Sequence, residues 1–251
     1  MDLTSILIAL VAGACIGAVL GFVGAGGAMV SVPIFIFLFD FSTAMATTAS
    51  LAVVGLAALA GLKARLKSKD LLIKEGLVIW ALGLSTNIGF GLLVPKIPEE
   101  LILFGFSLVL FTAAYSMFNV SANNNAEKQM PFWILVVLSL VIGSLSGLFG
   151  IGGGFLAIPV LIRYFNVSNN KAAGTSLFII ALNCFTALGA KISIWDQINW
   201  GYPILISFAA ILTSQSASKF AVKTSKVHLN RAFAVLLITI ASFTIFTRVF
   251  S

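Results

Sequence analysis

Charged side chains are scarce in this sequence. Asp, Glu, Lys and Arg together make up 9% of the 251 residues, whereas hydrophobic residues make up 60%. Soluble domains carry about 25% charged residues, and a soluble fold of this size cannot bury so much apolar surface. Several apolar stretches also reach the roughly 20 residues that one helix needs to cross a bilayer. The shortage of charge therefore excludes a soluble domain and predicts an all-α polytopic membrane protein.

Residues that support metal or catalytic chemistry are also few. The one histidine, His228, stands in a basic loop, and the two cysteines, Cys15 and Cys184, stand in apolar segments. No P-loop, zinc-protease or nucleophile-elbow motif is present, and the glycines from Gly24 onward do not form a dinucleotide-binding fingerprint. We therefore predict that the chain is not an enzyme and that it has no catalytic residues, no metal site and no cofactor.

Ionisable residues are missing from the middle of the apolar stretches. The acidic residues all stand near their ends: Asp2, Asp40, Asp70, Glu75, Glu99, Glu100, Glu127 and Asp196. A proton relay made of carboxylates thus has no candidate. Lys and Arg are not expected deep in any span either, so an anion site would have to be built from neutral groups.

Glycine, by contrast, follows a pattern that occurs twice. Residues 17–33 read GAVLGFVGAGGAMVSVP and residues 143–159 read GSLSGLFGIGGGFLAIP, at a constant offset of 126. Extended to residues 51 and 177, the ungapped pairing has 12 identical positions in 35. A repeat of half the chain length indicates a two-fold internal design. We expect a first transmembrane repeat at 1–120, a linker at 121–130 and a second transmembrane repeat at 131–251.

Each repeat is predicted to contain five segments, of which the second is short. The glycine runs break the helix, and the roughly 12 apolar residues that follow would span ~18 Å of a ~30 Å hydrocarbon core. These short segments are interpreted as half-helices or as arms of re-entrant hairpins. The predicted segments are 3–22, 28–39, 44–62, 75–94 and 101–119 in the first repeat and 131–149, 155–165, 172–190, 200–218 and 232–249 in the second.

The distribution of basic residues predicts the orientation. If the basic loop 63–74 is cytoplasmic, alternation of the helices places 12 of the 15 Lys and Arg residues on that side, and only Lys96, Lys191 and Arg248 opposite. This imbalance agrees with the positive-inside rule. It predicts a multi-pass protein of the plasma or inner membrane with both termini outside. The repeat partner of loop 63–74 is loop 190–199, which falls outside, so the two repeats are predicted to be inverted.

The duplicated glycine breaks, each followed by a proline at Pro33 or Pro159, and the matching TAS and GTS openings of the next spans carry a family resemblance. They resemble the TauE/SafE family of membrane anion permeases, named for sulfite export, over essentially the whole chain. The resemblance implies a secondary transporter that exports sulfite, a sulfonate or a related small sulfur-containing anion. The first break departs from the fuller pattern, with Ala25 and Ala28 where the second has Ile151 and Gly154.

The anion site is expected between the repeats, where inverted symmetry would bring both breaks together near the midplane. A helix that begins at such a break directs free N–H groups and a positive dipole end towards a ligand. Neighbouring hydroxyl and amide side chains would add donors, and rocking of the halves would expose the site to each side in turn. The predicted substrate-binding residues are Gly24, Gly26, Gly27, Thr48, Ser50, Asn87, Gly150, Gly152, Gly153, Gly154, Thr175, Ser176, Asn183 and Gln215.

Each class of these residues has a structural alternative. Glycines in membrane helices also serve close packing, and buried amides such as Asn87 and Asn183, which are not repeat equivalents, also pair between helices. Ser and Thr also bond back to the preceding turn. Arg163, the cation nearest a half-helix, is expected to extend to the cytoplasmic interface.

The predicted function also has alternatives. An anion channel and a membrane scaffold without transport remain alternatives to a carrier, because no motif separates them. The expected partners are a small anionic substrate and membrane lipid, with no nucleic acid, and the sequence does not specify an oligomeric state.

Overall fold

The computed structural model describes residues 3–23, 27–66, 71–118, 131–165, 167–221 and 226–249. Within these residues every regular element is a helix. The long and short α-helices are α1 (Leu3–Val23), α2 (Gly27–Phe39), α3 (Thr43–Leu66), α4 (Ile73–Leu93), α5 (Glu99–Phe118), α6 (Phe132–Phe149), α7 (Gly154–Phe165), α8 (Asn169–Ala190), α9 (Gly201–Ala221) and α10 (Lys226–Val249), with short 3-10 turns η1 (Val94–Lys96) and η2 (Ile192–Gln197). All ten predicted segments are therefore helical, and the predicted linker 121–130 lies outside the described residues.

Six helices are both long and apolar enough to cross a membrane: α1, α3, α4, α5, α6 and α8. The half-helix α2 and the apolar part of α10, residues 231–247, are shorter. The predicted span at 200–218 is a helix, α9, but it is not among the six. Its second half carries Thr213, Ser214, Gln215, Ser216 and Ser218, and these polar residues lower its hydropathy. The described part of the chain is thus all-helical with the apolar helices of a multi-pass membrane protein, and it includes the short helices α2 and α7 and the polar helix α9.

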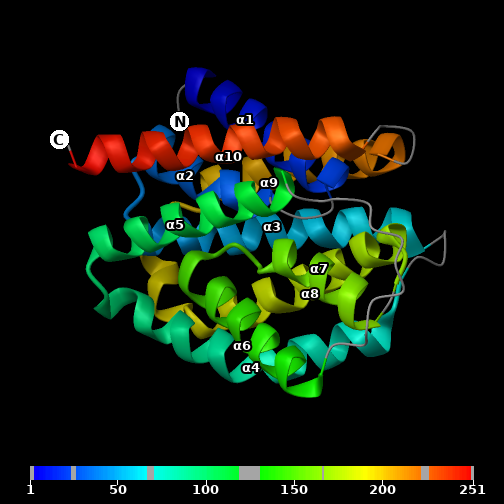
Figure 1. The fold of residues 1–251 in the computed structure, drawn as a ribbon. Helices are drawn as coiled ribbons and strands as arrows, with labels where there is room; N and C mark the ends of the chain where they lie inside the picture. Colours follow the sequence, from blue (N-terminus) through cyan, green and yellow to red (C-terminus); the bar gives the residue numbers. More distant parts are fainter. Residues whose placement is uncertain are drawn as a thin grey trace.

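Helices α3 and α8 pack against each other in the middle of the bundle (Figure 1). Helix α9 packs between α1 and α3, and helix α4 packs between α6 and α8. The short helix α2 lies against α3 and α1, while α7 lies against α8 and α6, and α5 pairs with α10. Segments from both halves of the chain therefore interleave, and each half packs on the other along α3 and α8.

Glycines set the closest of these contacts. A methyl group at Gly17 would collide with the carbonyl oxygen of Ala210, so α1 and α9 touch along their backbones. A methyl group at Gly143 would meet the carbonyl oxygen of Gly83 in the same way, which fixes α6 on α4. Small residues allow membrane helices to approach this closely, and packing then replaces the hydrophobic effect as the source of association.

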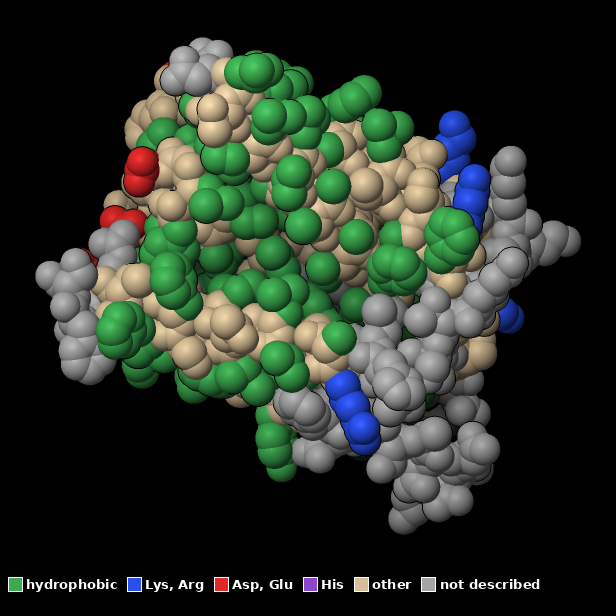
Figure 2. Space-filling view, turned by 90° about the horizontal axis from the view of Figure 1, so that it is seen from above, with side chains coloured by type: hydrophobic (Ala, Val, Ile, Leu, Met, Phe, Trp, Pro, Cys, Tyr) green, Lys and Arg blue, Asp and Glu red, His purple; other side chains and the backbone are tan. Residues whose placement is uncertain are grey.

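Charged side chains lie at the two ends of the bundle. On the face shown in Figure 2, acidic side chains lie at one end and basic ones at the opposite end, with a largely hydrophobic surface between them. The helix ends agree, because the last turns of α3 and α9 hold Lys63, Arg65 and Lys219, whereas the first turn of α5 holds Glu99 and Glu100. A hydrophobic surface between two polar ends is the form that a bilayer requires.

Candidate functional site

The second glycine break, between α6 and α7, has a backbone that only glycine adopts readily. Gly150, Gly152 and Gly153 have φ angles of 67°, 70° and 66°, in the left-handed region. Gly150 ends α6 as its cap, with its N–H donating to the carbonyl oxygen of Ser146 at 3.1 Å. An L-residue with a side chain is strained at these angles, so three glycines here specify a defined loop and not merely a gap in the helix.

This loop leaves backbone donors buried. Residues 151–154 are buried, and their N–H groups have no hydrogen-bond acceptor among the residues that the structure describes. Gly152 and Gly153 are left-handed in succession, and helix α7, which begins at Gly154, directs the positive end of its dipole towards this loop. The second break thus places buried backbone N–H groups at the start of a helix, and its role as an anion site stays a prediction.

The surroundings of the loop are packed tightly. A methyl group at Gly150 would lie 3.0 Å from the backbone Cα of Thr47 in α3. At Gly152 it would meet Ile180 at 2.9 Å and the sulfur of Cys184 at 3.0 Å, both in α8. At Gly153 it would lie 2.7 Å from the carbonyl oxygen of Ile142 in α6. The loop is therefore held between α3, α6 and α8.

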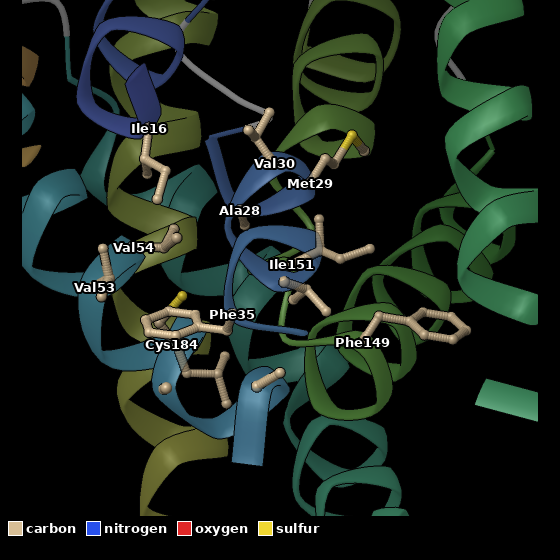
Figure 3. Close-up of a cluster of buried hydrophobic side chains, with 14 of the residues drawn as sticks. Ile16, Ala28, Met29, Val30, Phe35, Val53, Val54, Phe149, Ile151 and Cys184 are labelled. Atoms are coloured by element: carbon tan, nitrogen blue, oxygen red, sulfur yellow. The ribbon is translucent and has the colours of Figure 1, made fainter. Parts of the chain in front are cut away.

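Of the first glycine break, between α1 and α2, the structure describes only Gly27. Gly24 and Gly26 lie outside the described residues, so their predicted role stays a prediction. Gly27 is the first residue of α2, and a methyl group there would lie 2.9 Å from the carbonyl oxygen of Ile16. Side chains of α1, α2, α3 and α8 gather here in one hydrophobic cluster, which also contains Ile151 of the second break (Figure 3). The two breaks therefore adjoin one core.

Two predicted serines contact the second break directly. The hydroxyl of Ser50 donates to the carbonyl oxygen of Gly150 at 3.2 Å, and the hydroxyl of Ser176 donates to that of Gly154 at 2.8 Å. Both side chains are fully buried. They are repeat equivalents, and the structure brings both to the same loop. In this conformation both hydroxyl groups use their protons to bond to the loop. Each hydroxyl oxygen can therefore only accept a hydrogen bond from another group.

The two predicted threonines behave differently. Thr48 donates to the carbonyl oxygen of Ala44 at 2.7 Å, which is the bond to the preceding turn that the structural alternative describes. Thr175 accepts a hydrogen bond of 3.0 Å from the N–H of Leu72, just before α4. Neither threonine contacts the break through its hydroxyl, so the structure does not bring them together with the serines.

The two predicted asparagines meet each other. The amide nitrogen of Asn87 in α4 lies 3.0 Å from the side-chain oxygen and 3.1 Å from the backbone oxygen of Asn183 in α8. Asn183 in turn donates to the carbonyl oxygen of Gly152 at 3.4 Å. The side-chain oxygen of Asn87 is buried without a partner among the described residues. The amide pair thus links α4 to the loop, which sequence spacing alone did not indicate.

The remaining polar residues that the sequence singles out do not contact the second glycine break or lie outside the described side chains. Gln215 in α9 is half-buried and makes no hydrogen bond within the part of the chain that the structure describes. Thr213 bonds back to the carbonyl oxygen of Ala209 at 2.8 Å. The side chain of Arg163 is outside the described set. The structure therefore does not bring Gln215 to the break.

One buried cation was not expected at all. Lys191, which follows the last residue of α8, has a fully buried side chain, and its ammonium Nζ lies 3.1 Å from the hydroxyl oxygen of Thr47. Burial lowers the pKa of this ammonium group to about 7. Loop 190–199, which contains Lys191, is expected on the outer side, and no burial of that side chain is predicted. The signal that could have found it is the repeat itself, because an offset of 126 pairs Lys191 with Arg65, which is 8% exposed.

Comparisons with known proteins cover almost the whole chain. The family model described as "Sulfite exporter TauE/SafE" matches residues 9–244. The probable membrane transporter protein YunE of Bacillus subtilis is 28% identical over 230 residues, which are 80% of this chain and 83% of the relative. A probable membrane transporter protein of Xylella fastidiosa strain Temecula1 is 24% identical over 255 residues, which are 98% and 97% of the two chains. One from Haemophilus influenzae is 24% identical over 261 residues, 95% and 97% of the two.

Proposed function

The chain belongs to the sulfite exporter TauE/SafE family of membrane transporters, and from that premise we propose that it exports sulfite, a sulfonate or a related small sulfur-containing anion across the cytoplasmic membrane. The family is one of transporters and not of enzymes. The family name supplies the class of substrate, and the relatives are described as probable membrane transporters without a substrate. The chemistry of the site supports an anion.

The observation that carries the proposal is the set of buried N–H groups at residues 151–154, at the start of α7. Polar backbone groups without a partner are costly inside a membrane unless they line a place where a polar ligand binds. Donors without acceptors favour a ligand that is an acceptor on every side, as a sulfur oxyanion is. The loop is also fixed in place by its neighbours, so little ordering is needed on binding.

The proposed site residues divide by role. Gly150, Gly152, Gly153 and Gly154 form the loop that offers N–H groups, and Gly24, Gly26 and Gly27 are proposed to do the same from the first break. Ser50 and Ser176 position the loop by donating to its carbonyl oxygens. Asn87 and Asn183 hold it from the side of α4 and α8. Thr48, Thr175 and Gln215 stay weaker proposals, because no hydrogen bond of theirs reaches the loop.

Two pairs of matching contacts support an inverted repeat. Gly17 of α1 packs on the Ala210 carbonyl of α9, and Gly143 of α6 packs on the Gly83 carbonyl of α4. Gly143 stands 126 residues after Gly17, and Ala210 stands 127 residues after Gly83. The side chain of Asn87 donates to the backbone oxygen of Asn183, and Ser214 donates to that of Ala57 at 3.1 Å. Ser214 stands 127 residues after Asn87, and Asn183 stands 126 after Ala57. Exchange of the two halves thus preserves both kinds of contact.

Such a repeat supports alternating access. Helices α3 and α8 belong to different halves and pack on each other, so a rocking motion between the halves would move the loop relative to each end of the bundle. The basic last turns of α3 and α9 favour a cytoplasmic position for the end of the bundle where these two helices finish. Both termini of the chain would then lie outside.

The test is anion flux from proteoliposomes loaded with sulfite or methanesulfonate. We expect saturable efflux from the unaltered protein. Gly153→Val should lower it more than about 10-fold, because valine at a positive φ and 2.7 Å from the Ile142 carbonyl displaces the loop. Gly89→Val is the matched control, since no atom lies within 4 Å of a methyl group there.

Three results would contradict the proposal. Conductance at single-channel rates would identify a channel, and absence of flux for every sulfur anion tested would remove the substrate class. Full flux in a Gly153→Val protein that elutes as a folded particle would remove the loop from the mechanism.

A further inference from the structure

Lys191 is a buried cation with only one neutral partner. Its side chain has 0% relative exposure, and its ammonium group donates to the hydroxyl of Thr47 at 3.1 Å. Thr47 itself donates to the carbonyl oxygen of Ala44 at 3.1 Å. No carboxylate within the described ranges forms an ion pair with Lys191. A buried ammonium group without a counter-charge is expensive, because a hydroxyl dipole replaces only a small part of its hydration.

The helix dipoles act on this ammonium group in opposite directions, because Lys191 follows the negative C-terminal end of α8 while its side chain extends to the start of α3. Thr47 is in the second turn of α3, which begins at Thr43, so Lys191 reaches towards the positive end of that helix. A cation there is disfavoured, whereas an anion is stabilised. Glu99 lies at that helix start and accepts hydrogen bonds from the N–H of Thr43 at 3.0 Å and from its hydroxyl, and it does not pair with Lys191.

Thr47 connects Lys191 to the second glycine break. The backbone of Thr47 lies so close to Gly150 that a methyl group on Gly150 would stand 3.0 Å from its Cα. Gly91 in α4 is also near, with the Cε of Lys191 3.9 Å from where its methyl group would be. Through Thr47 the ammonium group is therefore close to Gly150, the first residue of the loop, at the end of the bundle where α8 finishes and α3 starts.

From this arrangement we infer that Lys191 supplies the positive charge that neutralises the transported anion at the 150–154 loop. The inference rests on the proposed function and changes one part of its mechanism. A site made only of backbone dipoles and hydroxyls would select anions by hydrogen bonding alone. With Lys191 near it, the site also selects by charge, and the anion brings the counter-charge that no described carboxylate supplies to Lys191.

The position of Arg65 supports a role for such cations in the passage of an anion. Arg65 ends α3 as Lys191 ends α8, and its guanidinium Nη1 lies 3.4 Å from the backbone oxygen of Asn170 in the first turn of α8. Each basic residue thus reaches from the end of one central helix to the beginning of the other. The pair α3 and α8 thus has one buried cation at each of its ends.

The experiment compares anion binding in Lys191→Met, Lys191→Arg and the control Lys96→Met. Lys96 is exposed and belongs to η1, on the side of the bundle where α8 ends. Affinity for sulfite, methanesulfonate and sulfate is measured from the shift in thermal unfolding of the purified full-length protein. We expect Lys191→Met to weaken binding about 10- to 100-fold, in line with the loss of a hydrogen bond to a charged group. Lys191→Arg should retain much of the affinity, and Lys96→Met should retain all of it.

Stability without added anion separates this role from a structural one. Methionine in place of an uncompensated buried lysine should leave the unfolding temperature unchanged or raise it, since no ion pair is lost. A Lys191→Met protein that binds every probe as tightly as the unaltered protein would overturn the inference while leaving the proposed function intact. An unaltered protein with neither a thermal shift nor flux for any of these anions would overturn both.

Discussion

At the scale of single residues, the side chains that matter most at the second break are those that bond to its backbone. Ser50 and Ser176 could be predicted, because the repeat aligns them and places them one turn or more inside a span. The pairing of Asn87 with Asn183 could not, because it joins positions that are not equivalent in the two halves. Sequence spacing reports neighbours along one helix, whereas this contact depends on how α4 crosses α8.

The contact of Lys191 with Thr47 is a second example of a contact between helices that sequence spacing does not report. Lys191 follows an apolar helix and belongs to a predicted outer loop, and its backbone does lie at the end of α8. The direction of its side chain is decided by the start of α3, which is more than 140 residues away in the sequence. The repeat pairs Lys191 with the basic Arg65, but the order of charges along the chain does not specify that the lysine contacts Thr47.

Anion binding should depend on pH through Lys191. Its pKa of about 7 without anion means that the group loses its charge as the pH rises above neutral, and a bound anion raises that pKa because it favours the charged form. Affinity is therefore full below pH 7 and is lost as the pH rises through the pKa of the complex. The other titratable groups on the surrounding elements are Asp40, Lys96, Glu99 and Asp196, and in the described chain none is ion-paired to Lys191.

Methanesulfonate is the suitable probe, since it stays a monoanion across this range. Titration of its affinity between about pH 6 and 9 should show the decline in the unaltered protein. In Lys191→Arg the curve should be flat, because a guanidinium group stays charged. A decline of equal size in the arginine variant would assign the pH dependence to another group.

At the scale of elements, the sequence predicts the helices well and the breaks in part. Every predicted segment corresponds to a helix, and the glycine runs mark where the helices stop. The left-handed angles at Gly150, Gly152 and Gly153 explain why the second run contains so many glycines. The polarity of α9 is not a defect of that helix, because Ser214 and Ser218 bond to the Ala57 and Gly21 carbonyl oxygens of its neighbours α3 and α1.

The contact of α1 with α9 should be sensitive to the smallest added group. We expect Gly17→Ala to destabilise the protein by about 1–3 kcal/mol, because the new methyl group collides with the Ala210 carbonyl and the Thr213 hydroxyl oxygens. Gly89→Ala, on a surface with nothing within 4 Å, should change stability by no more than about 1 kcal/mol. Thermal unfolding of both variants in the same detergent measures the difference, and equal unfolding temperatures would mean that α1 and α9 are not held by this contact.

At the scale of the whole molecule, the division of charge between the two ends leads to a prediction of sidedness. In a background with Cys15 changed to Ser, which leaves only the buried Cys184, single cysteines are placed at the exposed positions Ser168 and Ser193. A cysteine at 168 should react with a membrane-impermeant maleimide only after the cells are opened. A cysteine at 193 should react in intact cells, because α8 separates the two positions.

The labelling also tests the repeat. Reaction of both positions from the same side would mean that α8 does not cross the membrane, and the inverted arrangement of the halves would then be wrong. Reaction of 168 alone in intact cells would keep the crossing but reverse the predicted orientation.

The polar helix α9 has a consequence for how a cell makes this protein. Each helix leaves the ribosome in order and enters the lipid according to its own hydropathy, and α9 is not among the helices apolar enough to do so alone. Its serines find their acceptors on α3 and α1, which are synthesised long before it. We therefore expect α3 and α1 to provide the acceptors that allow α9 to enter the bilayer, so substitutions in α1 that disturb this contact should lower the amount of inserted protein.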